Sequence, residues 1–211
     1  MDQADVEGLA LELYRETRMD PCKPPPILTL ARSHPRIDDV IIEPLKRPGV
    51  FELTGPQRGL IRLAAHLRPW PRRYFCAHEF GEFGLEAQRR PYRGEDRERR
   101  AHQLGAALLI PAPALRAFLR DHGFDLAAMA ARFRVGQVCA FLRWAELTER
   151  SVAVVGGLFV ARRGRHPLPD DKELRRLVFE HIQGRSDSRF RFVTLFDPPN
   201  IERTGVIWER A

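Results

Sequence analysis

Three side chains that could bind or activate a metal fall within five residues, at His78, Glu79 and Glu82. The surrounding stretch, residues 72–83, is predicted to be helical. Residues four apart share one face of a helix, so His78 and Glu82 project together, and Glu79 lies about 100° round the axis. This spacing is typical of a helical zinc site in which two side chains bind the ion and the intervening glutamate activates water. The second ligand in such sites is His, whereas this chain has Glu82.

The same stretch could also be an ordinary helix that carries a buried histidine and two solvated carboxylates, because four-residue patterns recur by chance. Its neighbours argue for the metal site. Tyr74, Phe75, Phe80 and Phe83 make the helix strongly apolar around its polar residues. Polar groups in such surroundings need partners, and a metal ion would supply them.

A second helix, predicted at about residues 96–110, carries a matching pair of potential ligands. Glu98 and His102 are four residues apart and therefore share one face. Two helices can present such side chains across a shared groove, with two ligands from one helix and one from the next. The second helix is predicted to end at Pro111.

Together the two motifs resemble the ImmA/IrrE metallopeptidases. The stretch Arg-Tyr-Phe-Cys-Ala-His-Glu-Phe-Gly-Glu that ends at Glu82 is similar to the family pattern R-F-x-x-A-H-E-x-G-H. The stretch from Glu98 to Pro111 is similar to E-x-x-A-N-x-F-A-x-x-L-L-M-P. The resemblance covers about residues 25–145, and the two motifs agree with the family in order and spacing.

The resemblance implies a role for each residue of the two motifs. His78 would be the first metal ligand, Glu79 the catalytic general base and Glu98 the third ligand. The second ligand position, a histidine in the family, corresponds to Glu82. An asparagine of the family corresponds to His102, which could replace one ligand or orient one from outside the coordination shell.

The expected fold class is α+β, with a zincin-like peptidase core, a helical pair and a small C-terminal α/β lobe. Apolar and β-branched runs predict strands at 39–43, 49–53 and 59–63, which suggest a small, mostly antiparallel sheet packed on helices. We expect a metallopeptidase-like domain at residues 1–147 and the lobe at 151–211. The lobe should contain a strand over 151–161, a helix and two more strands.

A helix-turn-helix-like pair is predicted within the first domain, at residues 125–147. Such a pair can bind DNA. Its second helix is too apolar for a face that reads a groove, and only Gln137 and Arg143 suit that role. A structural role for the pair is therefore expected.

The donor set determines what chemistry the site could support. Zinc accepts carboxylate as well as imidazole ligands, so His78, Glu82 and Glu98 could form a three-ligand site. Two anionic ligands would leave the zinc site near neutral, make its water less acidic and weaken peptidase activity. More oxygen ligands would also favour manganese or another hard divalent ion.

Composition bounds the remaining possibilities. The net charge is +7, but the arginines are scattered along the chain, so direct nucleic-acid binding is not favoured. No apolar run of about 18 residues is present, the start of the chain does not read as a signal peptide, and the three cysteines are odd in number and widely spaced. These features predict a cytoplasmic protein with reduced thiols and no membrane partner.

Three functions remain in competition. The first is a metal-dependent endopeptidase that cleaves a transcriptional repressor in a stress or mobile-element response, as the resemblance implies. The second is a catalytically degenerate family member that binds a repressor-like, helix-turn-helix partner without cleaving it. The third is a DNA-associated regulator that uses the helical pair and the basic charge.

Overall fold

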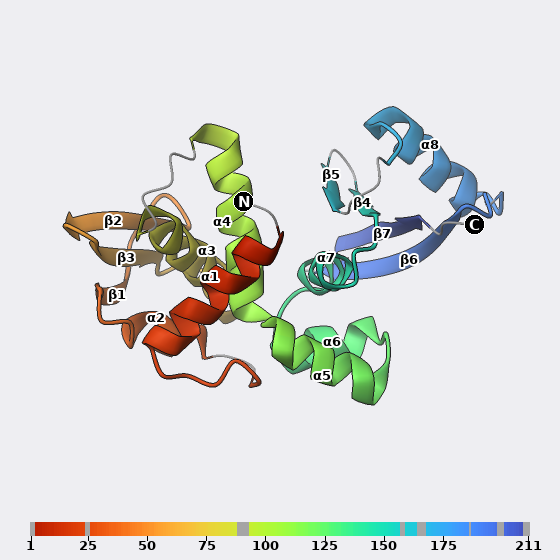
Figure 1. Ribbon diagram of the computed structural model, residues 1–211. Coiled ribbons are helices and arrows are strands. Elements are labelled where there is room, and N and C mark those ends of the chain that lie inside the picture. The colour runs from red at the N-terminus through yellow and green to blue at the C-terminus, as the bar shows by residue number, and fades with distance from the viewer. Residues whose placement is uncertain are drawn as a thin grey trace. The chain divides into compact units, whose positions relative to one another are not determined.

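The computed structural model describes residues 3–23, 26–87, 93–156, 159–163, 168–185, 187–197 and 201–208. These residues form helices and strands arranged in two compact units, as the α+β prediction requires (Figure 1). One unit contains residues 1–124 and 132–135, and the other contains 125–131 and 136–211. The expected domain boundary after residue 147 stays a prediction. No described helix combines the length and apolar character needed to cross a membrane.

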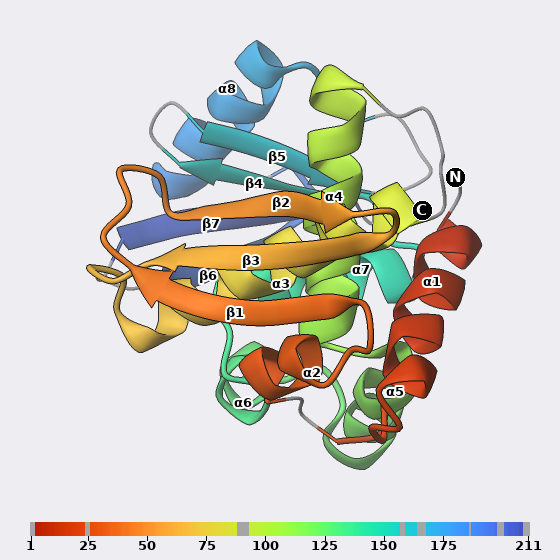
Figure 2. The ribbon, with the colours of Figure 1, turned by 90° about the vertical axis from the view of Figure 1, so that its left-hand side faces the viewer.

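The first unit is built on a three-stranded sheet with helices on one side. Its elements are α1 (Gln3–Glu16), α2 (Ile27–Arg32), β1 (Ile37–Glu43), β2 (Gly49–Gly55), β3 (Arg58–Ala64), α3 (Pro69–Ala87), α4 (Gly94–Leu109) and α5 (Ala112–His122). The strand order is β1-β3-β2, so β2 lies at an edge (Figure 2). The pairing of β2 with β3 is antiparallel, whereas that of β1 with β3 is parallel, so the sheet is mixed.

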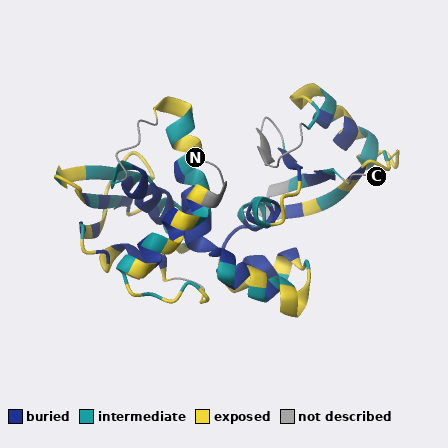
Figure 3. Ribbon diagram, viewed as in Figure 1, coloured by how far each residue is buried: buried dark blue, intermediate teal, exposed yellow. Residues whose placement is uncertain are grey.

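Burial in β3 explains why the sheet packs on helices. Ile61, Leu63 and Ala64 are fully buried, whereas Arg58 at the start of the strand is exposed. The helix α3, which runs behind the sheet in Figure 2, buries Phe80 and Phe83 in the same unit. The core is therefore the contact between one face of the sheet and α3 (Figure 3).

Small residues let α3 and α4 cross closely. A methyl group added at Gly81 would meet the Ala101 carbonyl oxygen at 2.9 Å, and one added at Gly105 would meet the backbone of Ala77 at 3.1 Å. With larger side chains at the crossing, α3 and α4 could not lie this close together. The crossing brings the polar face of α3 against the face of α4 that carries Glu98.

The second unit is a four-stranded antiparallel sheet with a helix packed on it. Its elements are most of α6 (Leu126–Phe133, whose last two residues belong to the first unit), α7 (Gln137–Leu147), β4 (Val152–Gly156), β5 (Phe159–Arg163), α8 (Asp171–Ile182), β6 (Phe190–Asp197) and β7 (Ile201–Trp208). The strand order is β5-β4-β7-β6. Leu174 and Leu177 of α8 share a buried cluster with Ala153 and Val206 of the sheet.

One detail of this unit differs from the sequence-based expectation. The single strand predicted over 151–161 is wrong, because β4 and β5 form an antiparallel hairpin in which Gly156 pairs with Phe159. Arg143, one of two residues suited to DNA contact, is fully buried and lies 3.6 Å from Glu146. The side chain of Phe141 on α7 packs against Gly205 of β7, so this face of α7 contacts the sheet.

Residues 88–92, between α3 and α4, lie outside the described residues.

Candidate metal centre

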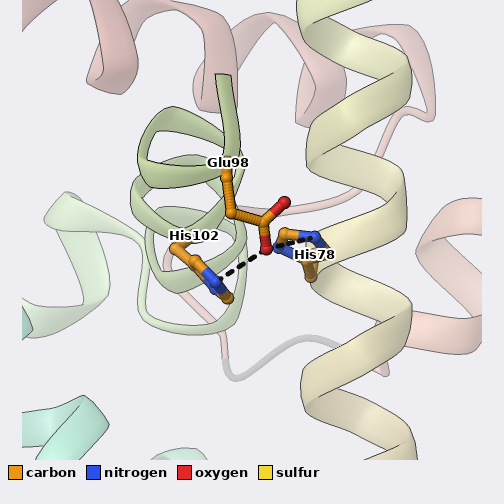
Figure 4. A group of neighbouring side chains, drawn as sticks. All are labelled: His78, Glu98 and His102. Atoms are coloured by element: carbon orange, nitrogen blue, oxygen red, sulfur yellow. Dashed lines mark ion pairs between the residues drawn. The ribbon is translucent and has the colours of Figure 1, made fainter. Parts of the chain in front are cut away.

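His78, Glu98 and His102 form a group of potential metal ligands between α3 and α4 (Figure 4). The Oε1 atom of Glu98 lies 3.5 Å from Nε2 of His78 and 3.0 Å from Nε2 of His102. The two imidazole rings are themselves close, with centroids 4.4 Å apart. One ligand atom from each residue lies within 4.8 Å of the others.

These distances suit a zinc ion. Zn–N and Zn–O bonds of about 2.0–2.1 Å imply separations of about 3.3 Å between tetrahedral ligand atoms. The two measured separations, 3.5 and 3.0 Å, bracket that value. Two imidazoles and one carboxylate are also a donor set of catalytic zinc sites. The residues present therefore fit the ion.

The buried state of His78 supports the same interpretation. Its residue is 7% exposed, and its Nδ1 atom is buried without a hydrogen-bond partner. Burial lowers the pKa of this imidazole, although the nearby Glu98 acts in the opposite direction. A neutral imidazole is the form that binds a metal, and this ring would bind through Nε2, the nitrogen that faces Glu98.

Glu79 lies on α3 beside this group and is held by the edge strand β2. Its carboxylate accepts a hydrogen bond from the backbone N–H of Phe51. Gly49 of the same strand leaves room for it, because a methyl group there would lie 2.8 Å from Oε1 of Glu79. Burial, together with the charges of Glu82 and Glu98, raises the pKa of Glu79 to about 7. A carboxyl group that titrates near neutral pH suits general-base chemistry.

Glu82 is held away from the ligand group. Its carboxylate pairs with the guanidinium of Arg97 on α4, and the same guanidinium donates to Oε2 of Glu86 at 2.8 Å. Glu86 lies one turn further along α3 than Glu82 and is therefore two turns from His78. Burial raises the pKa of Glu82, although Arg97 opposes the shift.

His102 has a partner on each side of its ring. Its Nε2 faces Glu98, whereas its Nδ1 lies 2.7 Å from the hydroxyl of Tyr74. Tyr74 belongs to α3, one turn before His78, and its ring stacks on His102 with centroids 5.9 Å apart and an interplanar angle of 21°. The orientation of the His102 ring is therefore determined from both ends.

The structure brings together three of the five residues singled out in the sequence, His78, Glu98 and His102, with Glu79 beside them. It pairs Glu82 with Arg97 instead. Sequence reasoning missed Arg97 and Tyr74. The only signal for Tyr74 was its position four residues before His78, on the same face of the helix.

Comparisons with known proteins give the chain a family and a similar fold. The Peptidase_M78 family model, described as an IrrE N-terminal-like domain, matches residues 38–144, just over half of the chain. None of the curated protein sequences compared with the chain matches it. A solved structure of a Mycobacterium tuberculosis transcriptional regulator is similar in fold, with a TM-score of 0.60 and 16% identity, over 97% of this chain and 87% of that one.

Proposed function

Because the chain belongs to the IrrE N-terminal-like peptidase family, we propose that it is a metal-dependent endopeptidase of the ImmA/IrrE type. The observation that carries this proposal is the position of the buried Glu79 beside three convergent metal donors. His78 and Glu98 are two of the ligands in this proposal. A divalent ion held there would supply Lewis-acid chemistry, which polarises a peptide carbonyl.

The protein's own contribution to hydrolysis centres on Glu79. Its carboxylate takes a proton from the attacking water and delivers it to the leaving amine. The N–H of Phe51 fixes the carboxylate in place, and burial keeps its proton affinity high enough for it to act as an acid in the second step. Gly49 preserves the space that the carboxylate occupies.

The strand β2 supplies a way to align the substrate. It is an edge strand of the sheet, and its residue Phe51 already touches the general base. An extended peptide can add to such an edge through backbone hydrogen bonds, with its side chains pointing alternately to either face. The proposed substrate is therefore a segment that is extended or that unfolds locally.

A transcriptional repressor with a helix-turn-helix domain is the proposed substrate class. The resemblance to the ImmA/IrrE family supports it, and the similar structure of a transcriptional regulator is compatible with a role in transcription control. Zinc is the proposed ion, because imidazole donors suit it better than they suit magnesium or manganese.

The test is cleavage of a proteome-derived peptide library and of a panel of purified helix-turn-helix repressors, read by mass spectrometry. Zinc-loaded protein should produce defined new termini, and Glu79→Gln should reduce their yield by about 100- to 10,000-fold. Glu12→Gln, an exposed change on α1, is the matched control and should have no effect. Equal cleavage by the Glu79→Gln protein would overturn the proposal.

The ion pair between Glu82 and Arg97 favours a second candidate function. A chain that has lost one ligand of the helical motif could serve as a binding module that holds a repressor-like partner without cutting it. This alternative predicts a stable complex with an intact repressor, and that complex should be equally stable with the Glu79→Gln protein. Sizing of the complex by light scattering, with the repressor checked for cleavage, separates the two functions.

A further inference from the structure

Besides His78 and Glu98, the site has one more donor, His102, which comes from α4 and not from α3. We propose that His102 is the third metal ligand, that Tyr74 positions it, and that the Arg97–Glu82 pair keeps Glu82 out of the coordination shell. This inference rests on the proposed function, because it assigns the ligands of the same site.

Glu82 is held in an ion pair with Arg97. Its side chain is only 13% exposed and it is paired with Arg97, whose own side chain is 31% exposed. Moving Glu82 to a metal would break this pair and leave the guanidinium with Glu86 alone. Truncating a partner of a largely buried, hydrogen-bonded charge pair is strongly unfavourable, so Glu82 stays with Arg97.

The donor set also determines the net charge of a bound metal ion. With Glu82 neutralised by Arg97, the donors that converge are two neutral imidazoles and the single carboxylate of Glu98. A zinc ion with this set carries a net charge of +1, whereas one imidazole and two carboxylates would cancel its charge. The positive site polarises a carbonyl more strongly, and its nitrogen donors favour zinc over manganese.

The hydroxyl of Tyr74 is placed to support the tautomer of His102 that binds a metal. A neutral imidazole that binds a metal through Nε2 must carry its proton on Nδ1. In His102 that nitrogen faces the Tyr74 hydroxyl at 2.7 Å. A hydroxyl both donates and accepts, so it can donate to Nδ1 when Nε2–H faces Glu98 and accept from Nδ1–H when Nε2 binds the ion. Tyr74 therefore supports the ligating form of His102 without any movement of the ring.

The arrangement reverses the expected division of ligands between the helices. The sequence motif suggested two ligands from α3 and one from α4, whereas here His78 comes from α3 and the pair Glu98 and His102 comes from α4. The pair is four residues apart on one helix face, so α4 presents both donors one turn apart. The close crossing at Gly81 and Gly105 brings His78 to them.

Zinc binding to the full-length protein tests this assignment. Stoichiometry is measured by elemental analysis and the dissociation constant by competition with a chromogenic chelator, and circular dichroism checks the fold of each variant. Wild type should bind one zinc ion. His102→Ala should weaken binding by more than about 100-fold, and Tyr74→Phe by about 10- to 100-fold, the range for partners that orient a metal ligand. Glu82→Gln should change the dissociation constant by less than threefold.

A second readout is specific to Tyr74. In ¹⁵N-edited NMR spectra, zinc should shift the His102 proton from Nε2 to Nδ1 in wild type, and the Nδ1–H should exchange faster with water in Tyr74→Phe. Arg99→Gln, a change at an exposed residue of α4, is the control and should leave affinity and spectra unchanged. Zinc binding by Tyr74→Phe with wild-type affinity and wild-type Nδ1–H exchange would show that the hydroxyl has no positioning role.

Other outcomes separate this inference from the proposed function. Loss of zinc in Glu82→Gln but not in His102→Ala, or a wild-type protein that binds no zinc, overturns the ligand assignment. Zinc bound through His102 without cleavage of any peptide overturns the proposed peptidase function and leaves the assignment intact.

Discussion

Arg97 joins Glu82 to Glu86: its Nε atom donates to the carboxylate of Glu82, and its Nη1 atom donates to Oε2 of Glu86 at 2.8 Å. The three residues connect α4 to two successive turns of α3 next to the ligand group. The contact therefore has two consequences. It stabilises the helix crossing, and it pairs Arg97 with Glu82, which does not belong to the group formed by His78, Glu98 and His102.

Arg97→Gln should destabilise the metal-free protein by about 1–3 kcal/mol, because it leaves the mostly buried carboxylate of Glu82 without its charged partner. The measurement is urea unfolding in the presence of a chelator. Arg99→Gln is the matched control on the same helix. Arg99 forms an exposed pair with Asp96, and its loss should cost less than about 1 kcal/mol. An equal loss of unfolding free energy in the two variants would show that the Arg97 pair stabilises the protein no more than an exposed pair does.

The crossing of α3 and α4 predicts opposite effects for one substitution at two glycines. Gly81→Ala should destabilise the protein by about 1–3 kcal/mol, because the new methyl group meets the Ala101 carbonyl oxygen at 2.9 Å. Gly8→Ala should stabilise it by about 0.5–1 kcal/mol, because nothing lies within 4 Å and alanine favours a helix. Thermal unfolding of both variants shows whether each substitution raises or lowers the stability. Stabilisation by Gly81→Ala would mean that the helices can separate at no cost.

The sequence predicted α3, α4 and the three strands of the first unit, because their signals are local. The strands β1 to β3 carry runs of β-branched and apolar residues bounded by glycine and proline, and α3 and α4 carry motifs whose spacing only a helix makes meaningful. The parallel pairing of β1 with β3 was not predicted, because the order of strands in a sheet depends on contacts between distant residues.

The candidate site shows a similar division. The spacing of residues 78–82 and of Glu98 and His102 was enough to predict which helix faces carry the donors. Spacing could not tell that Arg97, the residue beside Glu98, reaches back to Glu82, because that contact depends on how α3 and α4 cross. It also could not pair Tyr74 with His102, which are 28 residues apart.

A buried histidine that is not part of the ligand group predicts that the protein loses stability in acid. His34 is 1% exposed; its Nε2 atom contacts a carboxylate oxygen of Glu16, and its Nδ1 accepts from the backbone N–H of Arg36 at 3.2 Å. Burial lowers the pKa of His34 below its usual 6.5. The unfolded chain therefore binds a proton at a pH where the folded protein does not, and the stability present above pH 6.5 is lost as the pH falls.

His34→Gln should reduce this dependence on pH. The variant can still donate to Glu16 but cannot take up a proton. The slope of the free energy of unfolding against pH, between pH 6.5 and 5, should therefore fall by up to about 1.4 kcal/mol per pH unit. Urea unfolding of chelated protein at several pH values measures the slope. His66→Gln replaces an exposed histidine and serves as the control. An unchanged slope in His34→Gln would place the acid sensitivity elsewhere.

The buried carboxyl group of Glu79 predicts that the protein loses stability at alkaline pH. The pKa of Glu79 rises on folding from 4.5 to about 7, chiefly because the carboxyl is buried. The folded protein therefore holds a proton between these values that the unfolded chain has released. The stability contribution of Glu79 is full below pH 4.5 and is lost as the pH rises through 7.

Glu79→Gln should consequently stabilise the metal-free protein at pH 8 by about 2–3 kcal/mol and have little effect at pH 4.5, because the amide keeps an acceptor for the Phe51 N–H without a charge. Urea unfolding in a chelator at the two pH values measures the difference. Glu12→Gln, which changes an exposed carboxylate, should alter stability by less than about 0.5 kcal/mol at either pH. A Glu79→Gln protein no more stable than wild type at pH 8 would mean that the carboxylate is solvated, and its role as a base tuned by burial would fail.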